Sequence, residues 1–108
     1  MGYYTDYDFK ITGIDNESQA DKIIEDLQLL NCETSDDGTE LISYTHEKWY
    51  SWKEDVIAVS KTYPRVLFEI QGNGEENGDI WKARIRNGIA EVIHAKIKIT
   101  FDDFKEIC

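Results

Sequence analysis

The stretch GNGEENGD, residues 72–79, combines three glycines with three carboxylates. Glycine-rich loops can cradle a phosphate, clustered carboxylates can hold a cation, and glycines also form turns between strands. A phosphate-binding loop needs a Lys and a Ser or Thr after its last glycine, whereas Asp79 follows Gly78 here. Three carboxylates would also repel a phosphate, so the sequence argues against a phosphate-binding loop.

A cation is the second possibility for this stretch. Glu75, Glu76 and Asp79 are hard oxygen ligands that lie close together, which makes them weak candidates for a metal site. The spacing of a calcium loop is absent, and no second ligand cluster lies nearby in the sequence. We therefore expect residues 72–79 to be a turn between two strands, with its glycines supplying backbone freedom and with no metal or cofactor bound.

Catalytic residue combinations are also weak in this sequence. His46 and His94 are the only histidines, and neither accompanies a Ser or Cys nucleophile with an orienting acid. Adjacent carboxylates such as Asp36 and Asp37 point in different directions on a strand or helix, so they form no acid/base pair by themselves. We expect a protein that is not an enzyme.

Two stretches show the apolar spacing that is typical of amphipathic helices. The first opens with a capping residue at Asp15 or Asn16 and has an acidic outer face; its apolar residues are Ala20, Ile23, Ile24, Leu27 and Leu30. The second covers residues 48–63 and stops before Pro64; its repeating residues are Trp49, Trp52, Val56, Val59 and Tyr63.

Alternating apolar residues predict strands over residues 7–11, 39–46 and 66–70, and a short strand over 32–35 would pair with the second of these across Asp36-Asp37-Gly38. The pair Asn87-Gly88 predicts a type I′ hairpin that places Arg84 opposite Glu91. The core side of this hairpin is expected to carry Trp81, Ala83, Ile85, Ala90 and Val92. Beyond it we expect a bulge near Ala95 and a short closing helix.

This order of elements predicts an α+β fold. A βαββαβ core is the ferredoxin-like arrangement, in which two helices pack on one face of an antiparallel sheet, here with an added C-terminal hairpin strand. With 108 residues, the chain has the size of one domain, and we expect a single ferredoxin-like domain over residues 1–108.

Part of the sequence also resembles a family. Pro64 stands ahead of a VLFEI strand, followed by GNGEENGDIW and a closing NG. This pattern resembles the YubB-type ferredoxin-like domain of small phage, plasmid and mobile-element proteins, and the resemblance covers residues 49–88. It implies the fold and a mobile-element setting, and it implies no reaction, because the family has no established catalytic residues.

Charge is the strongest compositional feature. The chain has 22 acidic and 12 basic residues, net −10; residues 1–80 carry −12 and residues 81–108 carry +2. Such a surface repels nucleic acid and anionic membranes and attracts a basic protein. The sequence has no apolar run of membrane-spanning length and no secretory pattern, and Cys32 and Cys108 lack metal or redox spacing. These features favour the cytoplasm, and the mobile-element setting that the resemblance implies makes it the cytoplasm of a bacterial host.

The leading functional hypothesis is a phage or mobile-element interaction protein that inhibits a host defence system of the anti-CRISPR or anti-restriction type. It would present an acidic mimic of nucleic acid to the basic groove of a nucleic-acid-binding host protein. The acidic candidates are Asp21, Glu25, Asp26, Asp36, Asp37 and Glu40, and the aromatic candidates are Tyr3, Tyr4 and Tyr50.

Other functions stay open. The chain could be a small accessory or self-associating domain, with homo-oligomers possible, or a ligand- or metal-binding module that uses residues 72–79. The basic strip Lys82, Arg84 and Arg86 could contact nucleic acid or an acidic partner. At a net charge of −10, a solvated strand with an Arg84–Glu91 ion pair is the favoured interpretation of that strip, without direct nucleic-acid binding.

Overall fold

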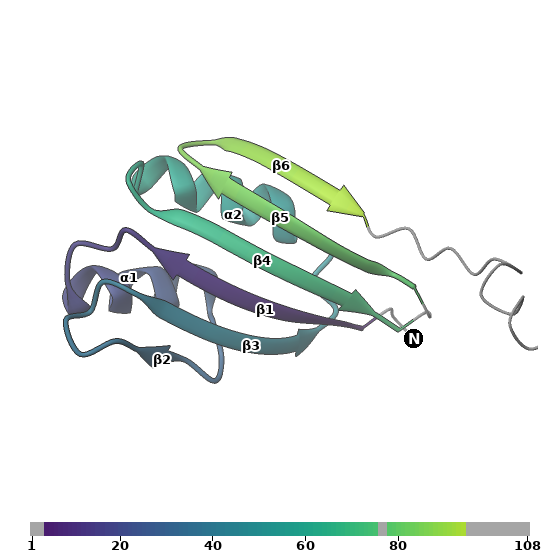
Figure 1. Ribbon diagram of the computed structural model, residues 1–108, viewed down its shortest axis with the longest axis horizontal. Coiled ribbons are helices and arrows are strands. Elements are labelled where there is room, and N and C mark those ends of the chain that lie inside the picture. The colour runs from purple at the N-terminus through teal and green to yellow at the C-terminus, as the bar shows by residue number, and fades with distance from the viewer. Residues whose placement is uncertain (1–3, 76–77, 95–108) are drawn as a thin grey trace, which may run out of the picture.

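The computed structural model describes residues 4–75 and 78–94, and within these it contains two helices and one six-stranded sheet (Figure 1). The helices are α1 (Glu17–Leu27) and α2 (Trp52–Thr62). The strands are β1 (Thr5–Thr12), β2 (Glu33–Thr34), β3 (Leu41–Glu47), β4 (Leu67–Gly74), β5 (Ile80–Arg86) and β6 (Ile89–His94). They lie in the order β2-β3-β1-β4-β5-β6, and every neighbouring pair is antiparallel. The α+β class is confirmed.

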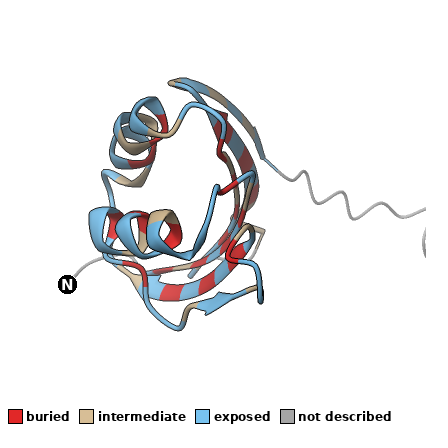
Figure 2. Cartoon of the chain, turned by 90° about the vertical axis from the view of Figure 1, so that its left-hand side faces the viewer, coloured by how far each residue is buried: buried red, intermediate tan, exposed pale blue. Residues whose placement is uncertain are grey.

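Both helices lie on one face of the sheet, and the core fills the space between these two layers (Figure 2). The period-2 pattern of the sequence sets which residues face the helices. In β1, Tyr7, Phe9 and Ile11 are buried, while Asp8 and Lys10 point to the other side and are exposed. We call this other side, turned away from the helices, the open face.

Helix α1 begins where the sequence predicts and ends earlier. The side chain of Asn16 caps it by accepting a hydrogen bond from the Gln19 backbone N–H at 2.9 Å. Gln28 adopts the left-handed conformation with φ 53° and ends the helix. The prediction that Leu30 belongs to the apolar face is therefore wrong: Leu29 turns into the core, and 52% of Leu30 is exposed.

Helix α2 starts four residues later than predicted, because Trp49 packs from the preceding turn. Its indole N–H donates to the Asp55 carboxylate at 2.7 Å, and the Ser51 hydroxyl donates to the same oxygen at 2.9 Å. The Trp49 ring lies edge-on to Tyr7 and stacks near Phe9. The apolar spacing that includes Trp49 thus reflects burial against β1 and not a helical turn.

The hairpin of β5 and β6 is confirmed in detail. Asn87 and Gly88 have φ values of 48° and 80°, as a type I′ turn requires. Arg84 pairs with Glu91 across the two strands. The expected bulge near Ala95 and the closing helix lie outside the described residues.

Strand β4 extends into residues 72–79, so the connection between β4 and β5 is shorter than predicted. Strand β4 runs to Gly74 and β5 begins at Ile80. Gly78, with φ 86°, supplies the predicted backbone freedom, whereas Gly72 is a core residue of β4. A Cβ at Gly72 would lie 2.0 Å from the ring of Trp81, which stacks on Trp52 at 4.2 Å between centroids. Glycine is needed here because the Trp81 indole occupies the side-chain space.

Candidate functional site

The largest concentration of charge lies on α1 and the turn between β2 and β3. Residues 13–40 contain nine acidic residues and one basic residue, Lys22, for a net charge of −8. The turn packs directly on the start of α1: a Cβ at Gly38 would lie 2.3 Å from the backbone nitrogen of Glu17. The Ile14 N–H also donates to the Thr39 carbonyl at 3.2 Å. This packing places the turn between β2 and β3 beside α1 (Figure 1), and both segments are rich in acidic residues.

Three carboxylates line one side of α1. Glu17, Asp21 and Glu25 are spaced four residues apart, so they follow one another at about 6 Å along the helix axis. All three are exposed, and they lie away from the face that Ala20 and Ile23 bury. Glu17 was not predicted as a site residue. The four-residue spacing could have revealed it, whereas its contact with Gly38 could not be seen in the sequence.

The two aspartates of the turn differ in environment. One oxygen of Asp37 accepts hydrogen bonds from the Thr39 hydroxyl at 2.8 Å, the Thr39 N–H at 3.1 Å and the Ser35 hydroxyl at 2.8 Å. The Thr39 side chain, followed by its backbone N–H and by Ser35, lowers the pKa of Asp37, because these donors favour the charged form. Asp37 therefore holds the turn, while Asp36 is exposed beside it.

Two other predicted acids differ in their contacts. Asp26 accepts a hydrogen bond from the Tyr63 hydroxyl at 2.8 Å and so faces α2. Burial of the ring, followed by this hydrogen bond, raises the pKa of Tyr63 to about 12. Glu40 is exposed just before β3, and its backbone closes the turn: its N–H donates to the Ser35 hydroxyl at 3.0 Å, and its carbonyl accepts from the Ser35 N–H at 2.9 Å.

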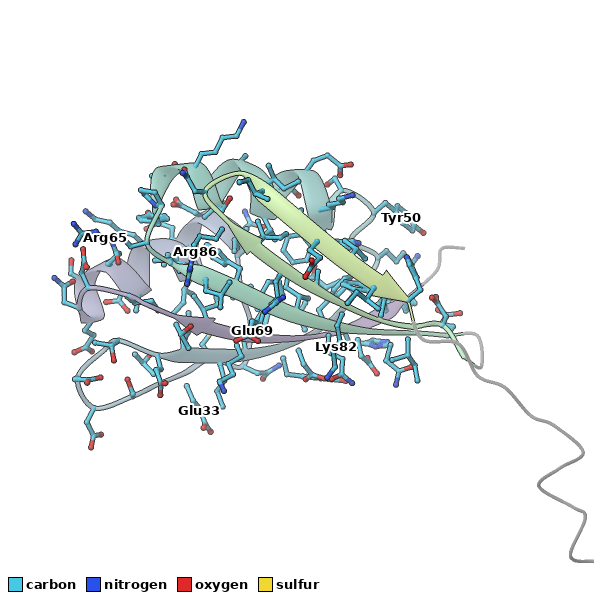
Figure 3. The ribbon with its side chains drawn as sticks, turned by 45° about the horizontal axis from the view of Figure 1, so that its top comes forward. Glu33, Tyr50, Arg65, Glu69, Lys82 and Arg86 are labelled. Atoms are coloured by element: carbon cyan, nitrogen blue, oxygen red, sulfur yellow. The ribbon has the colours of Figure 1, made fainter. Side chains whose placement is uncertain are left out.

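The predicted acids thus divide by position. Asp21 and Glu25 follow Glu17 along the exposed side of α1, and Asp36 lies in the turn whose Gly38 packs on Glu17; we call these four residues the acidic surface. Asp26 is bound by Tyr63, and Asp37 and the Glu40 backbone hold the turn. Figure 3 shows Glu33 of the edge strand β2 extending away from the sheet.

The aromatic candidates are distributed over separate places. Tyr4 stacks on His46 with 4.9 Å between ring centroids, and the Lys48 ammonium lies 5.1 Å from the Tyr4 ring. Tyr50 lies in the turn before α2 and is 68% exposed. Tyr3 lies outside the described residues. Tyr4 is therefore held in place by its neighbours, and Tyr50 presents the larger surface.

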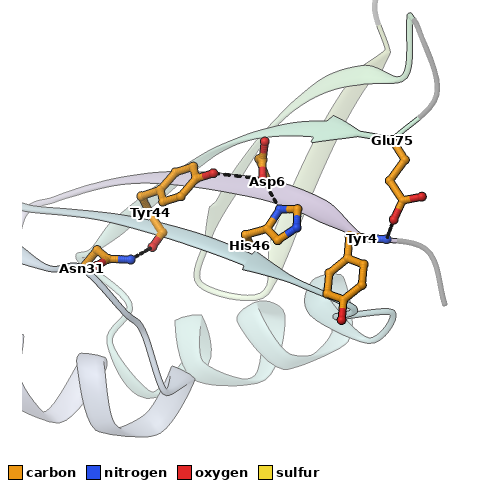
Figure 4. A network of polar contacts seen from close by, with 6 residues as sticks. All are labelled: Tyr4, Asp6, Asn31, Tyr44, His46 and Glu75. Atoms are coloured by element: carbon orange, nitrogen blue, oxygen red, sulfur yellow. Dashed lines mark hydrogen bonds and ion pairs between the residues drawn. The ribbon is translucent and has the colours of Figure 1, made fainter. Parts of the chain in front are cut away.

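His46 belongs to a polar cluster where β1 begins and β3 ends (Figure 4). Its Nδ1 contacts one oxygen of Asp6, and the Tyr44 hydroxyl donates to the same oxygen at 3.0 Å. The contact with His46 is the main cause of the lowered pKa of Asp6. An aspartate that orients a histidine is half of a nucleophile-activating arrangement, but among the described residues no Ser or Cys hydrogen-bonds to His46. Nothing in the sequence indicates this cluster, because Asp6 lies 38 and 40 residues from Tyr44 and His46.

The carboxylates of residues 72–79 are also partly engaged. Glu75 accepts a hydrogen bond from the Tyr4 backbone N–H at 2.6 Å. The Gly74 N–H donates to the Asp79 carbonyl at 2.8 Å and closes the turn. Glu76 lies outside the described residues, and within the part of the chain that is described no group of three His, Cys, Asp or Glu side chains could hold a metal.

The open face is balanced in charge. On β1, β4, β5 and β6 it carries Lys10, Lys82, Arg84 and Arg86 against Asp6, Asp8, Glu69 and Glu91. The Arg84 guanidinium contacts Glu91 at 2.9 Å, as the hairpin register predicts. The basic strip is thus neutralised by acids on the same face, and the excess negative charge lies elsewhere, most of it on residues 13–40.

No protein-family model, curated protein or solved structure matches this chain. The YubB-type resemblance therefore stays a prediction. In the described part of the chain, neither helix has the length and apolar character that crossing a membrane requires.

Proposed function

We propose that this chain is a non-catalytic interaction protein that binds a basic, nucleic-acid-binding protein through the acidic surface. One observation carries the proposal: the turn at Gly38 packs on Glu17 and so sets the acidic turn between β2 and β3 beside the acidic helix α1. Two flexible acidic segments would repel each other and separate. Here the fold keeps them together.

The mechanism is electrostatic mimicry. Carboxylates on the acidic surface take the places of phosphates opposite Lys and Arg side chains of the partner, with which they form charge-assisted hydrogen bonds. Their backbone positions are fixed in advance, since the Asn16 cap and the core hold α1 and Asp37 holds the turn. Single exposed ion pairs contribute little, so the net −8 of residues 13–40 acts mainly by steering the partner and by excluding nucleic acid from its groove.

The setting we propose is a phage or mobile element, with the protein acting in the bacterial cytoplasm as an inhibitor of a host defence system of the anti-CRISPR or anti-restriction type. The YubB-type resemblance supports this setting, and the fold is compatible with it. The order βαββαβ with the sheet order β2-β3-β1-β4 supports a ferredoxin-like core, which β5 and β6 then extend.

A capture experiment tests the proposal. The purified protein is immobilised, incubated with bacterial lysate and washed at low or high salt. We expect a nucleic-acid-binding protein to be retained at low salt and released at high salt, because ion pairs at an exposed interface are screened. Retention that high salt does not reduce would contradict the electrostatic mechanism.

Variants identify the surface that binds. Asp21→Asn combined with Glu25→Gln removes two charges from the acidic surface, and we expect it to lose most of the captured protein. Asp8→Asn combined with Glu54→Gln also removes two negative charges, one from the open face and one from α2, where both residues are exposed. This variant should capture as much protein as the wild type does. Equal loss in both variants would show that only overall charge matters, and it would overturn the assignment to α1 and the turn.

A further inference from the structure

The open face carries charges that alternate in sign across the sheet. In the register of the strands, Lys10 of β1 lies beside Glu69 of β4, Glu69 beside Arg84 of β5, and Arg84 beside Glu91 of β6. Neighbouring strands are about 4.8 Å apart, so these four side chains form one row of alternating charge at the same height along the strands.

The same four strands enclose a hollow of about 380 Å³ on the open face. The charged row forms part of its lining, together with a second row of Asp8, Gln71, Lys82 and Ile93. The hollow is therefore centred between β4 and β5. Beside it, β6 exposes two large apolar side chains, with Ile89 76% and Ile93 64% exposed.

We propose that the open face binds a second copy of this chain, face to face, about a two-fold axis that runs parallel to the strands between β4 and β5. Rotation about this axis places β4 of one copy opposite β5 of the other, and β1 opposite β6. Residues at the same position along the strands therefore face each other. Glu69 then lies opposite Arg84 of the other copy, and Lys10 lies opposite Glu91. Each pair occurs twice, because a two-fold interface is self-complementary.

The alternation of charge selects this axis over its neighbours. An axis along β4 would place Glu69 opposite itself and Lys10 opposite Arg84, and an axis along β5 would place Arg84 opposite itself. An axis between β1 and β4 would pair Lys10 with Glu69 but would leave β6 and its two isoleucines outside the contact. Only the axis between β4 and β5 pairs all four charges of the row and also covers Ile89 and Ile93.

Charge also explains why two acidic molecules would meet on this face. Each chain carries −10, so most approaches between copies are repulsive. The four strands of the open face carry equal numbers of acidic and basic residues and thus provide a neutral contact. The helices lie on the opposite side of the sheet, so the acidic surfaces of α1 would face outward in the dimer (Figure 2). The dimer does not rest on the proposed function, because it uses another face.

The dimer is expected to be weak. Four strands are about 19 Å across, so the contact falls at the small end of specific interfaces, and we expect dissociation at roughly 10–100 µM. Sedimentation equilibrium between about 10 and 500 µM covers that range. A single monomeric species throughout would overturn the proposal.

Charge-swapped variants test the pairing between copies. Glu69→Arg puts a positive charge opposite Arg84 of the second copy, and Arg84→Glu puts a negative charge opposite Glu69, so each variant alone should dimerise at least tenfold more weakly. An equimolar mixture of the two restores opposite charges at both positions, and we expect the heterodimer to form with an affinity close to that of the wild type. Contacts within one chain cannot produce this rescue. In the mixture, Glu69→Arg still has two arginines side by side on β4 and β5, and Arg84→Glu still has two glutamates there.

Matched controls separate the interface from general charge. Glu54→Arg and Lys53→Glu make charge changes of the same sign on exposed positions of α2 and should dimerise as the wild type does. Thermal melting followed by circular dichroism checks that all variants fold. Failure of the mixed variants to associate would refute the proposal, and rescue of Glu69→Arg by Lys10→Glu instead of Arg84→Glu would refute the stated axis.

Discussion

Replacing Gly72 by alanine tests whether this residue belongs to the core or to a loop. The added Cβ would lie 2.0, 2.1 and 2.4 Å from three atoms of the Trp81 indole, far inside ordinary contact distance. Trp81 is only 7% exposed, and its ring stacks on Trp52 at 4.2 Å and lies edge-on to Tyr7. The ring therefore has to leave its position.

The magnitude follows from these contacts. Overpacking a core costs about 1–3 kcal/mol, and the loss of an aromatic pair adds about 0.5–1.5 kcal/mol. The lower backbone entropy of alanine in the unfolded chain returns about 0.5–1 kcal/mol. Taking the middle of each range, we expect Gly72→Ala to lower the free energy of unfolding by about 2 kcal/mol, a large part of the ~5–15 kcal/mol typical of a domain.

Urea denaturation, followed by circular dichroism and tryptophan fluorescence, measures this change. Asn73→Ala is the matched control, because Asn73 is the next residue of β4 and is exposed on the open face. It should change the free energy by less than about 0.5 kcal/mol. The reasoning would be refuted if Gly72→Ala also stayed within that limit, or if it cost as much in a Trp81→Leu background, where the indole is absent.

Three further changes test other parts of the structure by the same unfolding assay. Thr45 is 1% exposed and its hydroxyl has no hydrogen-bond partner among the described residues, so Thr45→Val should raise the free energy of unfolding by about 1 kcal/mol; a loss of stability would show that the hydroxyl is satisfied. The buried Ser60 hydroxyl accepts from the Gly88 N–H at 2.8 Å, so Ser60→Ala should cost about 1–2 kcal/mol, and no cost would mean that this contact between α2 and the hairpin turn is absent. The pKa of Tyr63 is raised to about 12, so its contribution to stability is present below pH 10 and is lost as pH rises from 10 to 12. Tyr63→Phe, which cannot ionise, should lose less stability over that range than the wild type, and an unchanged alkaline profile would contradict the raised pKa.

The parts of the fold that the sequence predicted well depend on local chemistry. Asn87-Gly88 determines its hairpin because both residues need positive φ, and the register of β5 and β6 follows from the turn. The alternation in β1 and the Asn16 cap of α1 are equally local. Each of these patterns is complete within about ten residues of sequence.

The parts that were missed depend on contacts between distant residues. Trp49 has helical spacing with Trp52, but it is placed by Tyr7 and Phe9 of β1. Gly72 is explained by a ring on the next strand. The sequence shows which contacts a glycine or a tryptophan can make. Which contacts it does make depends on residues that are distant in the sequence and close in the fold.

The candidate site shows the same division. The acidic bias of residues 13–40 and the four-residue spacing along α1 are visible in the sequence. The hydrogen bond from Tyr63 to Asp26 and the packing of Gly38 on Glu17 are not visible in the sequence, because each joins segments about 20 to 40 residues apart. The charge was therefore predictable, whereas the subset of acids that shares one surface was not.

Competition with nucleic acid tests the central claim most directly. The immobilised protein captures its partner from bacterial lysate at low salt, with or without an excess of double-stranded DNA. If the acidic surface of Glu17, Asp21, Glu25 and Asp36 occupies the partner's phosphate-binding groove, capture should fall as the DNA concentration rises and should be lost at saturating DNA. A basic partner retained in full at saturating DNA would contradict mimicry, because the protein and the DNA would then occupy different sites.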